Sequence, residues 1–278
     1  MKRAYTLAIL VPALVLWVWA FVAEPYFCLE KRDEVAAVEN FPEGFGGLKI
    51  AIVSDTHIGR GFHERIRARR IADAVNAQSP DIILFLGDYT NGYFYQTSPP
   101  DAVLVDFFSS FKAKYGKFGI YGNHDFLAGI PRIKGILEAS GIKILCNSNE
   151  RVETPSGSFY LAAIADPQTM DYSYSAALKD IPNHSPIIFM MHTPAVLREI
   201  PERVRIAISG HTHGGQLRLP YLGNIVPLRG IPREFVGRSA YYGGKLLSIN
   251  SAGLGLSRIP ARFFCPPEFT ILRIIPKK

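Results

Sequence analysis

Five short clusters of Asp, Asn and His residues each follow directly after an apolar run, and this order is the sequence feature that most limits the fold. The apolar runs are short, as expected for buried strands. In α/β folds the carboxyl ends of neighbouring strands meet at one edge of a sheet, and ligands bind there. The sequence therefore predicts an α/β domain whose functional residues lie in the loops that follow its strands.

The segments around these clusters give the expected architecture. Strand-like runs alternate with amphipathic, helix-like stretches in the first part of the chain. We expect strands at residues 48–53, 81–86, 118–121 and 142–145, and helices at 64–77, 102–112 and 133–139. Hairpin-like strands are expected at 159–164, 187–191 and 204–208, and further β-type runs at 245–249 and 269–274. This order favours two sheets with helices outside over a single doubly wound sheet.

The clusters contain residue types that bind metal ions. They are Ser54-Asp55-Thr56-His57, Gly87-Asp88-Tyr89-Thr90-Asn91, Gly122-Asn123-His124-Asp125, Met190-Met191-His192 and Gly210-His211-Thr212-His213-Gly214-Gly215. Residues two apart in an extended chain point to the same side, so the Asp55 and His57 side chains can reach one ion. His211 and His213 would repel each other if both were charged, whereas a cation binds both as neutral ligands. Most of these clusters taken alone read equally well as a turn or a core histidine, but their ordered set makes coincidence improbable.

Together the clusters resemble the motif set of the calcineurin-like metallophosphoesterase superfamily. The resemblance is closest to its bacterial membrane-associated, phosphodiesterase-like branch, in which G-H-T-H-G-G-Q is followed by a strand containing Leu and Pro, here Gln216 to Pro220. It covers the chain from Leu48 to the C-terminus. It implies a four-layer α/β/β/α sandwich and a dinuclear metal-dependent phosphoric ester hydrolase.

The resemblance also implies a division of the ligands. Asp55, His57 and His213 would hold one divalent metal ion, and Asn123, His192 and His211 would hold the other. Asp88 would bridge the two ions. Carboxylate, amide and imidazole ligands suit Mn, Fe, Zn or Mg and do not select among them. A hydroxide bridging the ions would then attack a phosphate ester or phosphoanhydride.

His124 matches the family histidine that is not a ligand, which implies that it stabilises the transition state or protonates the leaving oxygen. In the phosphoprotein phosphatases of the superfamily, a carboxylate three residues after the bridging Asp orients this imidazole, but here that residue is Asn91. Gly92 replaces an Arg typical of those phosphatases, which argues against a phosphoprotein substrate. Arg60, the first of several arginines after the first motif, is a candidate for binding a substrate phosphate or a lipid headgroup; a solvated helix face is the alternative.

An uncharged apolar stretch at residues 4–23 has the length of a transmembrane helix. We interpret residues 1–23 as a signal anchor, 24–47 as a tether and 48–278 as the catalytic domain. The alternative is a cleaved secretory signal, since Val18 and Ala20 have the spacing of a cleavage site. The nearly balanced basic flanks give little information on orientation, and the amino-terminal amine favours an external catalytic domain. The three cysteines, Cys28, Cys146 and Cys265, lack the spacing of a metal or redox motif.

The charge of the chain limits its partners. Lys and Arg number 31 against 24 Asp and Glu, a formal net charge of +7, and this surplus attracts phosphorylated substrates, anionic lipids or nucleic acid. With the anchor, a phospholipid or a nucleotide-linked lipid becomes an attractive substrate. Basic and aromatic residues do not interleave as in a strand-binding groove, so no specific nucleic acid is expected. The alternative functions are a non-catalytic metal-binding sensor on the same fold and a nuclease.

Overall fold

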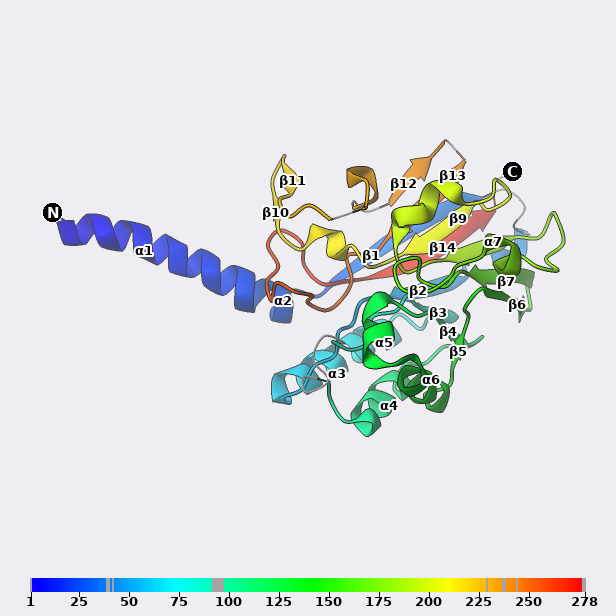
Figure 1. Cartoon of the computed structure of the whole chain (residues 1–278), viewed down its shortest axis with the longest axis horizontal. Helices are drawn as coiled ribbons and strands as arrows, with labels where there is room; N and C mark the ends of the chain where they lie inside the picture. Colours follow the sequence, from blue (N-terminus) through cyan, green and yellow to red (C-terminus); the bar gives the residue numbers. More distant parts are fainter. Residues whose placement is uncertain are drawn as a thin grey trace.

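Two six-stranded sheets packed face to face form the centre of the molecule (Figure 1). The computed structural model describes residues 2–38, 41, 43–91, 98–228, 230–236, 239–243 and 245–276. The first sheet has the order β1 (Glu30–Val38), β14 (Glu268–Pro276), β2 (Lys49–Val53), β3 (Ile82–Phe85), β4 (Lys117–Gly119) and β5 (Ile142–Ile144). The second has the order β12 (Ser239–Tyr242), β13 (Leu246–Asn250), β9 (Ile206–Ser209), β8 (Ile187–Met190), β7 (Gly157–Ala163) and β6 (Ser148–Thr154).

The central strands β3 and β8 are apolar and buried along their whole length because both of their faces are covered. In β2, Ile50 and Ile52 point into a core shared with the second sheet, whereas Ala51 and Val53 point into a second core beneath the helices. Strand side chains alternate between faces, so one short apolar run supplies both cores. This explains why the runs show no polar alternation in the sequence.

Helices cover the outer face of each sheet. The first sheet packs against α3 (Phe62–Asn76), α4 (Asp101–Ser109) and α6 (Ile130–Ala139), and α5 (Asn123–Ala128) follows β4. The outer layer of the second sheet is thin, being built from the short helices α7 (Tyr174–Ala177), η4 (Pro194–Glu199) and η6 (Arg233–Phe235). The predicted sandwich of two sheets between helical layers is therefore confirmed.

The second sheet differs from the predicted hairpin-like strands. Strands β7, β8, β9 and β13 are parallel, and only the edge pairs β6–β7 and β12–β13 are antiparallel. The connections between the parallel strands contain helices of only four to six residues, α7 and η4. Such short helices leave no helical period in the sequence, so the parallel crossovers could not be recognised there.

The expected tether contains a strand of the first sheet. β1 pairs in parallel with β14 from Glu30–Glu268 to Val38–Pro276. The buried Arg32 donates to the Glu268 carboxylate and to the Asn250 carbonyl, each at 3.1 Å. The charged residues of this segment suggested a solvated chain, but they fit a strand at the edge of a sheet, where one side remains open to water.

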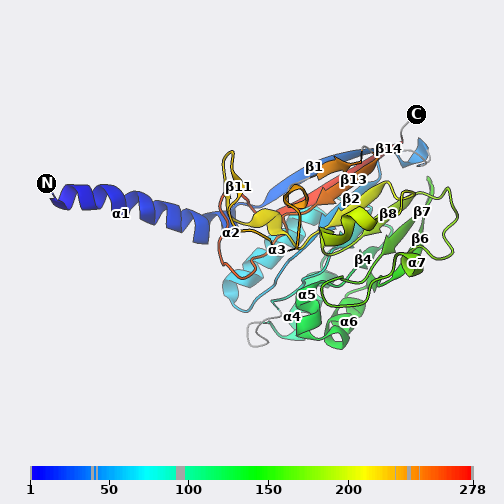
Figure 2. The same cartoon turned by 45° about the horizontal axis from the view of Figure 1, so that its top comes forward.

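An N-terminal helical arm projects away from the sandwich (Figures 1 and 2). It consists of α1 (Lys2–Val18), the π-helical turn η1 (Trp19–Ala23) and α2 (Glu24–Phe27). Within the described part of the chain, one helix, Ala8–Phe27, is long and apolar enough to cross a membrane. The arm joins the sandwich at its C-terminal end, where the Arg262 amide donates to the Ala20 carbonyl at 2.8 Å.

Candidate metal centre

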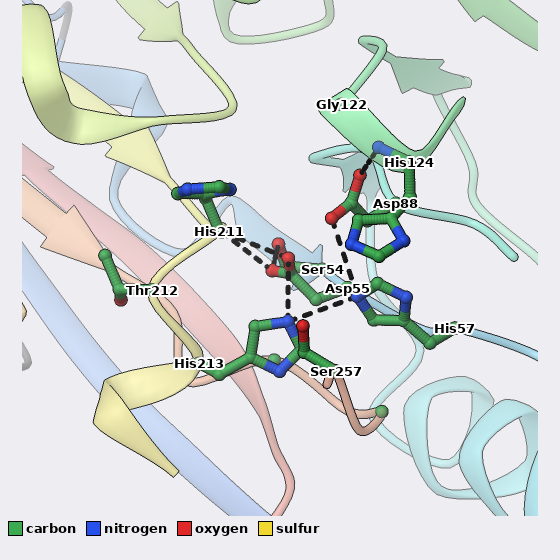
Figure 3. Close-up of polar contacts among 12 residues, drawn as sticks. Ser54, Asp55, His57, Asp88, Gly122, His124, His211, Thr212, His213 and Ser257 are labelled. Atoms are coloured by element: carbon green, nitrogen blue, oxygen red, sulfur yellow. Dashed lines mark hydrogen bonds and ion pairs between the residues drawn. The ribbon is translucent and has the colours of Figure 1, made fainter. Parts of the chain in front are cut away.

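Loops at the carboxyl ends of five strands build the site, as the sequence predicted. Asp55 and His57 follow β2, Asp88 follows β3, and Asn123 and His124 follow β4 in the first sheet. His192 follows β8 and the pair His211 and His213 follows β9 in the second sheet. Figure 3 shows side chains from both sheets turned towards one another. The site therefore lies between the two sheets, at the edge where the carboxyl ends of these five strands meet.

The backbone at this edge is unusually strained. Asp55, His57, Asp88, His211 and His213 all have positive φ angles, between 40° and 63°. Non-glycine residues in this region cost about 1–3 kcal/mol each and usually occur where the surrounding structure or function requires them. A Cβ at Gly87, where φ is 89°, would lie 2.5 Å from the Gly122 amide nitrogen, so these two loops can approach only because residue 87 is glycine.

Four side chains form the first group of candidate ligands. Ligand atoms of Asp55, His57, Asp88 and His213 all lie within 4.8 Å of one another, and the four residues are buried. The Nε2 atoms of His57 and His213 are 3.1 Å apart. His57 Nε2 lies 3.5 Å from Asp88 Oδ2, and His213 Nε2 lies 3.4 Å from Asp55 Oδ1. Two imidazole nitrogens facing each other beside two carboxylates provide one compact cation site.

The second group shares Asp88 with the first. Asp88, His192 and His211 again have ligand atoms within 4.8 Å of one another. His192 Nε2 lies 3.4 Å from Asp88 Oδ2, 3.2 Å from His211 Nδ1 and 3.2 Å from the Asn123 side-chain oxygen. The structure thus brings together all seven side chains that the sequence indicated as ligands, with Asp88 between the two groups.

Neighbouring groups fix the orientation of the second pair of imidazoles. His192 Nδ1 lies 2.6 Å from the Leu86 carbonyl, so this nitrogen carries the proton and Nε2 faces the site. His211 Nε2 lies 3.1 Å from the Gln168 side-chain amide, and its Nδ1 faces His192 Nε2 at 3.2 Å. Partners of this kind hold metal ligands in place, and the Leu86 carbonyl also sets the tautomer of His192.

The electrostatics of the residues fit divalent cations. Burial lowers the pKa of His57 and of His211, each to about 3, so both offer neutral lone pairs at pH 7. Burial raises the pKa of Asp55 to about 6. Burial is also the largest single influence on the pKa of Asp88 and of His192. The attraction between these two side chains acts against burial, so the pKa of Asp88 is lowered and the pKa of His192 is raised. Buried carboxylates that need positive charge suit a metal centre.

His124 lies beside the ligands at the start of α5. Its ring centroid is 4.6 Å from that of His57, and its backbone amide donates to Asp88 Oδ1 at 2.8 Å. Burial, as the main cause, lowers the pKa of His124, so its imidazole is neutral at pH 7. This position is at the edge of the metal centre, where a side chain could contact a substrate.

The two predicted substrate contacts, Arg60 and Asn91, lie on one side of the centre. Both line a cavity of about 320 Å³ that also reaches His57. The exposed Arg60 side chain donates from Nε to the Ser98 carbonyl at 2.5 Å. Gly92, used above to argue against phosphoprotein substrates, lies outside the described residues.

Asp125 and Arg67 support the centre in ways that the sequence did not reveal. The Asp125 carboxylate accepts hydrogen bonds from the amides of Asp88, Tyr89 and Gly122, at 2.8 to 3.0 Å, and so joins two ligand loops. Arg67, one of the arginines that follow the first motif, is buried and donates to the carbonyls of Thr56 and His57. The i,i+3 pair with Glu64, 2.7 Å apart, was the only sequence signal for this structural role.

Comparison with known proteins assigns the family. Residues 48–215 match the model of the calcineurin-like phosphoesterase family. The uncharacterized metallophosphoesterase YkuE of Bacillus subtilis is 28% identical over 260 residues, covering 92% of this chain and 88% of that protein. The uncharacterized metallophosphoesterase Cj0846 of Campylobacter jejuni is 30% identical over 258 residues, covering 89% of this chain and 65% of that protein.

Two further relatives add information on architecture. A transmembrane protein with metallophosphoesterase domain from Danio rerio is 29% identical over 199 residues, covering 66% of this chain and 44% of that protein. The solved structure of the NAD nucleotidase of Haemophilus influenzae superposes with a TM-score of 0.50 at 13% identity, covering 74% of this chain and 45% of that chain. At this identity the superposition supports the fold alone.

Proposed function

Because the chain belongs to the calcineurin-like phosphoesterase family, we propose that it hydrolyses a phosphate ester or phosphoanhydride at a dinuclear metal centre. The observation that carries this proposal is the position of Asp88, whose carboxylate belongs to both groups of candidate ligands. A carboxylate with two oxygens can bind two cations at once. Asp88 lies between the two groups, so its two oxygens are placed to reach a cation in each.

The residues have separate tasks in this proposal. Asp55, His57 and His213 would hold one ion, Asn123, His192 and His211 would hold the other, and Asp88 would contribute to both sites. Two divalent cations there would supply a hydroxide nucleophile near neutral pH and would neutralise the phosphoryl oxygens. The ligand set suits Mn, Fe, Zn or Mg. Arg60 and Asn91 line the adjoining cavity, where a substrate phosphate would find a positive charge and an amide.

His124 acts on the leaving oxygen in this scheme. Its neutral imidazole can donate a hydrogen bond to that oxygen, but full proton transfer requires protonation of the ring first. Burial opposes this protonation, and Asn91 carries no charge that would stabilise an imidazolium. We therefore expect the enzyme to favour substrates with good leaving groups, such as phosphoanhydrides.

A pair of substitutions tests the assignment. His124→Asn should retain both metal ions and lower kcat for esters with poor leaving groups, by about 10²- to 10⁴-fold if the ring acts as a general acid. Asp88→Asn should lose metal and activity together. Metal content, measured by elemental analysis, separates the two effects. Loss of metal in His124→Asn would contradict the assignment of His124, and equal losses for p-nitrophenyl esters and alkyl esters would contradict its action on the leaving oxygen.

Two features support a membrane location, which in turn makes a lipid-linked substrate part of the proposal. The helix Ala8–Phe27 is long and apolar enough to span a bilayer, and the related protein from Danio rerio is described as a transmembrane protein. We propose that the arm is a single-pass anchor with the catalytic domain on the external face. Protease digestion of intact cells tests the orientation, because an external domain is degraded and a cytoplasmic one is protected.

The substrate class can be tested with metal-loaded, full-length protein. A panel of phosphomonoesters, phosphodiesters and lipid pyrophosphates, assayed with and without Mn²⁺, identifies the preferred bond. Activity on lipid-linked compounds well above that on water-soluble analogues would support a phospholipid or nucleotide-linked lipid. Metal binding without turnover of any member would favour the alternative of a non-catalytic sensor.

A further inference from the structure

Two adjoining cavities lie where the N-terminal arm meets the catalytic domain. The polar cavity of about 320 Å³, described above, reaches His57 and is lined by Arg60 and Asn91. The second, of about 380 Å³, lies between α2 and α3 and is lined mainly by apolar groups, among them Val22, Phe27 and Ile66. Tyr26, His63 and Arg67 line both cavities. The two cavities are therefore neighbours with a shared wall.

We propose that the apolar cavity binds an alkyl chain of an amphiphilic phosphate whose headgroup occupies the polar cavity beside the metal centre. This inference rests on the hydrolytic function proposed above and adds a binding site for the apolar part of the substrate. It assigns a ligand-binding role to the end of the membrane anchor itself.

Contacts within the shared wall keep the cavities in place. The rings of Tyr26 and His63 pack edge to face with centroids 5.7 Å apart. The buried Arg67 is fixed by its bonds to the carbonyls of Thr56 and Leu254, so its aliphatic stem lines the cavities while its charge is already satisfied. Arg70 donates to the Tyr26 and Phe27 carbonyls at 2.6 and 3.3 Å. These bonds attach the end of α2 to α3.

The anchor is also attached to the opposite side of the domain. The buried Glu24 carboxylate accepts hydrogen bonds from the amides of Phe264 and Cys265 at 3.0 and 2.5 Å, and from the Trp19 indole at 2.7 Å. The two backbone donors, Phe264 and Cys265, make a specific attachment of the arm to the domain, and the Trp19 bond holds the Glu24 carboxylate within the arm. The wall formed by α2 is thus a fixed part of the site.

The surroundings of the cavities suit a ligand that comes from a bilayer. The apolar side chains of Phe62, Phe264, Tyr221 and Leu222 are exposed. The last two lie at the tip of the hairpin formed by β10 (Arg218–Leu219) and β11 (Gly223–Asn224), which Figures 1 and 2 place at the end of the domain from which the arm projects. Exposed apolar groups around an anchor helix can rest in the headgroup region. An alkyl chain could then enter the apolar cavity without crossing water.

The chemistry of the two cavities favours an amphiphile over a free nucleotide. A headgroup phosphate in the polar cavity would find the exposed Arg60 guanidinium and the His57 side of the candidate metal centre. A water-soluble nucleotide would fill only that cavity and would gain nothing from Val22, Phe27 and Ile66. An alkyl chain removes their apolar surface from water, and this burial favours binding.

The test compares methyl phosphate with octyl phosphate on the metal-loaded, full-length protein. Both compounds are expected to inhibit hydrolysis of whichever substrate the enzyme turns over among p-nitrophenyl phosphate and bis-p-nitrophenyl phosphate, and calorimetry measures their binding directly, with phosphate release assayed in parallel. Each buried methylene strengthens binding roughly fourfold, so burial of four methylenes gives a gain on the order of 200-fold for octyl phosphate. The proposal is overturned if octyl and methyl phosphate bind equally.

Substitutions locate the site of any gain. Ile66→Glu places a charge at the apolar cavity. It should reduce the ratio of octyl phosphate affinity to methyl phosphate affinity at least about tenfold and leave the affinity for methyl phosphate unchanged. Val35→Glu on β1 is the matched control, since Val35 is 52% exposed and Ile66 is 47% exposed. An advantage that persists in Ile66→Glu would show that the chain partitions into detergent, and would also overturn the proposal.

The two readouts separate this inference from the proposed hydrolysis. Calorimetric chain-length preference without turnover would support the cavity and reject the hydrolytic function. Turnover of the small ester without a chain-length preference would support the hydrolytic function and reject the alkyl-chain cavity. Vesicles that contain phosphatidic acid and vesicles that contain a nucleotide-linked lipid pyrophosphate then distinguish the sources of the amphiphile, because each releases a different water-soluble product.

Discussion

Replacing Asp125 by Asn should weaken metal binding although Asp125 is not among the ligands. Its two carboxylate oxygens accept three buried amides, with the Asp88 and Gly122 amides on Oδ2 and the Tyr89 amide on Oδ1. An asparagine amide can accept on one side only. The nitrogen of the asparagine side chain would place its own N–H against a backbone N–H, so at least one buried backbone donor loses its partner.

The size of the effect follows from these bonds. Leaving a buried N–H without its partner costs about 1–3 kcal/mol. For a domain of this size, such a loss lowers the melting temperature by roughly 2–12 °C. Displacement of the loop that carries Asp88 should weaken metal binding about 10- to 100-fold, as is typical when a partner of a ligand is removed.

Calorimetric titration of Mn²⁺ into metal-free protein measures the affinity, and thermal unfolding measures the stability. Asp106→Asn, on the exposed face of α4, is a control in which both quantities should stay unchanged. An Asp125→Asn protein with unaltered Mn²⁺ affinity and melting temperature would refute the view that this carboxylate holds the two ligand loops together.

Three further results are expected. Chelation of the metal should lower the melting temperature by roughly 10 °C when the free ion had been present at about a thousand times its Kd; no change after verified removal would contradict this. The affinity for Mn²⁺ should rise with pH, up to about tenfold per unit, because the raised pKa of His192 keeps a proton that the metal must displace; titrations at pH 6, 7 and 8 that give one Kd would contradict it. Deleting residues 2–18 should preserve hydrolysis of a small chromogenic ester, whereas deleting residues 2–27 should lower the melting temperature because Glu24 and the Ala20 carbonyl are lost; equal melting temperatures would show that the attachment contributes no stability.

The candidate ligands could be predicted because their signal is local. Each lies within a few residues of a strand end, and strand ends are visible as the points where apolar runs stop. The alternation of side chains in extended backbone then places Asp55 with His57 and His211 with His213 on common sides. The resemblance to a known motif set supplied the division into two metal groups, which spacing alone did not.

Other parts of the fold depend on contacts between distant segments, and the sequence carries little local sign of them. Strand β1 pairs with β14, more than two hundred residues later, and its charged composition resembles a solvated linker. Asp125 and Arg67 act through backbone amides and carbonyls of other loops, and backbone groups leave no trace in the residue types. The parallel order of the second sheet was missed for a related reason, since its short connecting helices lack a period.

The segment that follows β13 links the anchor to the metal centre. Its residues Leu254 and Gly255 donate backbone hydrogen bonds to the carbonyls of Ser54 and Asp55 at 3.0 and 2.7 Å. The fully buried Arg262 holds the segment in shape by donating to backbone carbonyls on both sides of the turn, including Gly253 and Cys265.

The same segment meets the anchor on its other face. The Arg262 amide donates to the Ala20 carbonyl, and the Cys265 amide donates to the Glu24 carboxylate. One continuous stretch of backbone therefore contacts both a ligand loop and the end of the N-terminal helical arm. Because these contacts are hydrogen-bonded, the position of the candidate metal centre relative to the arm is set by the fold and not by a flexible linker. A fixed position of this kind is what an enzyme needs if its substrate remains partly in the bilayer during hydrolysis.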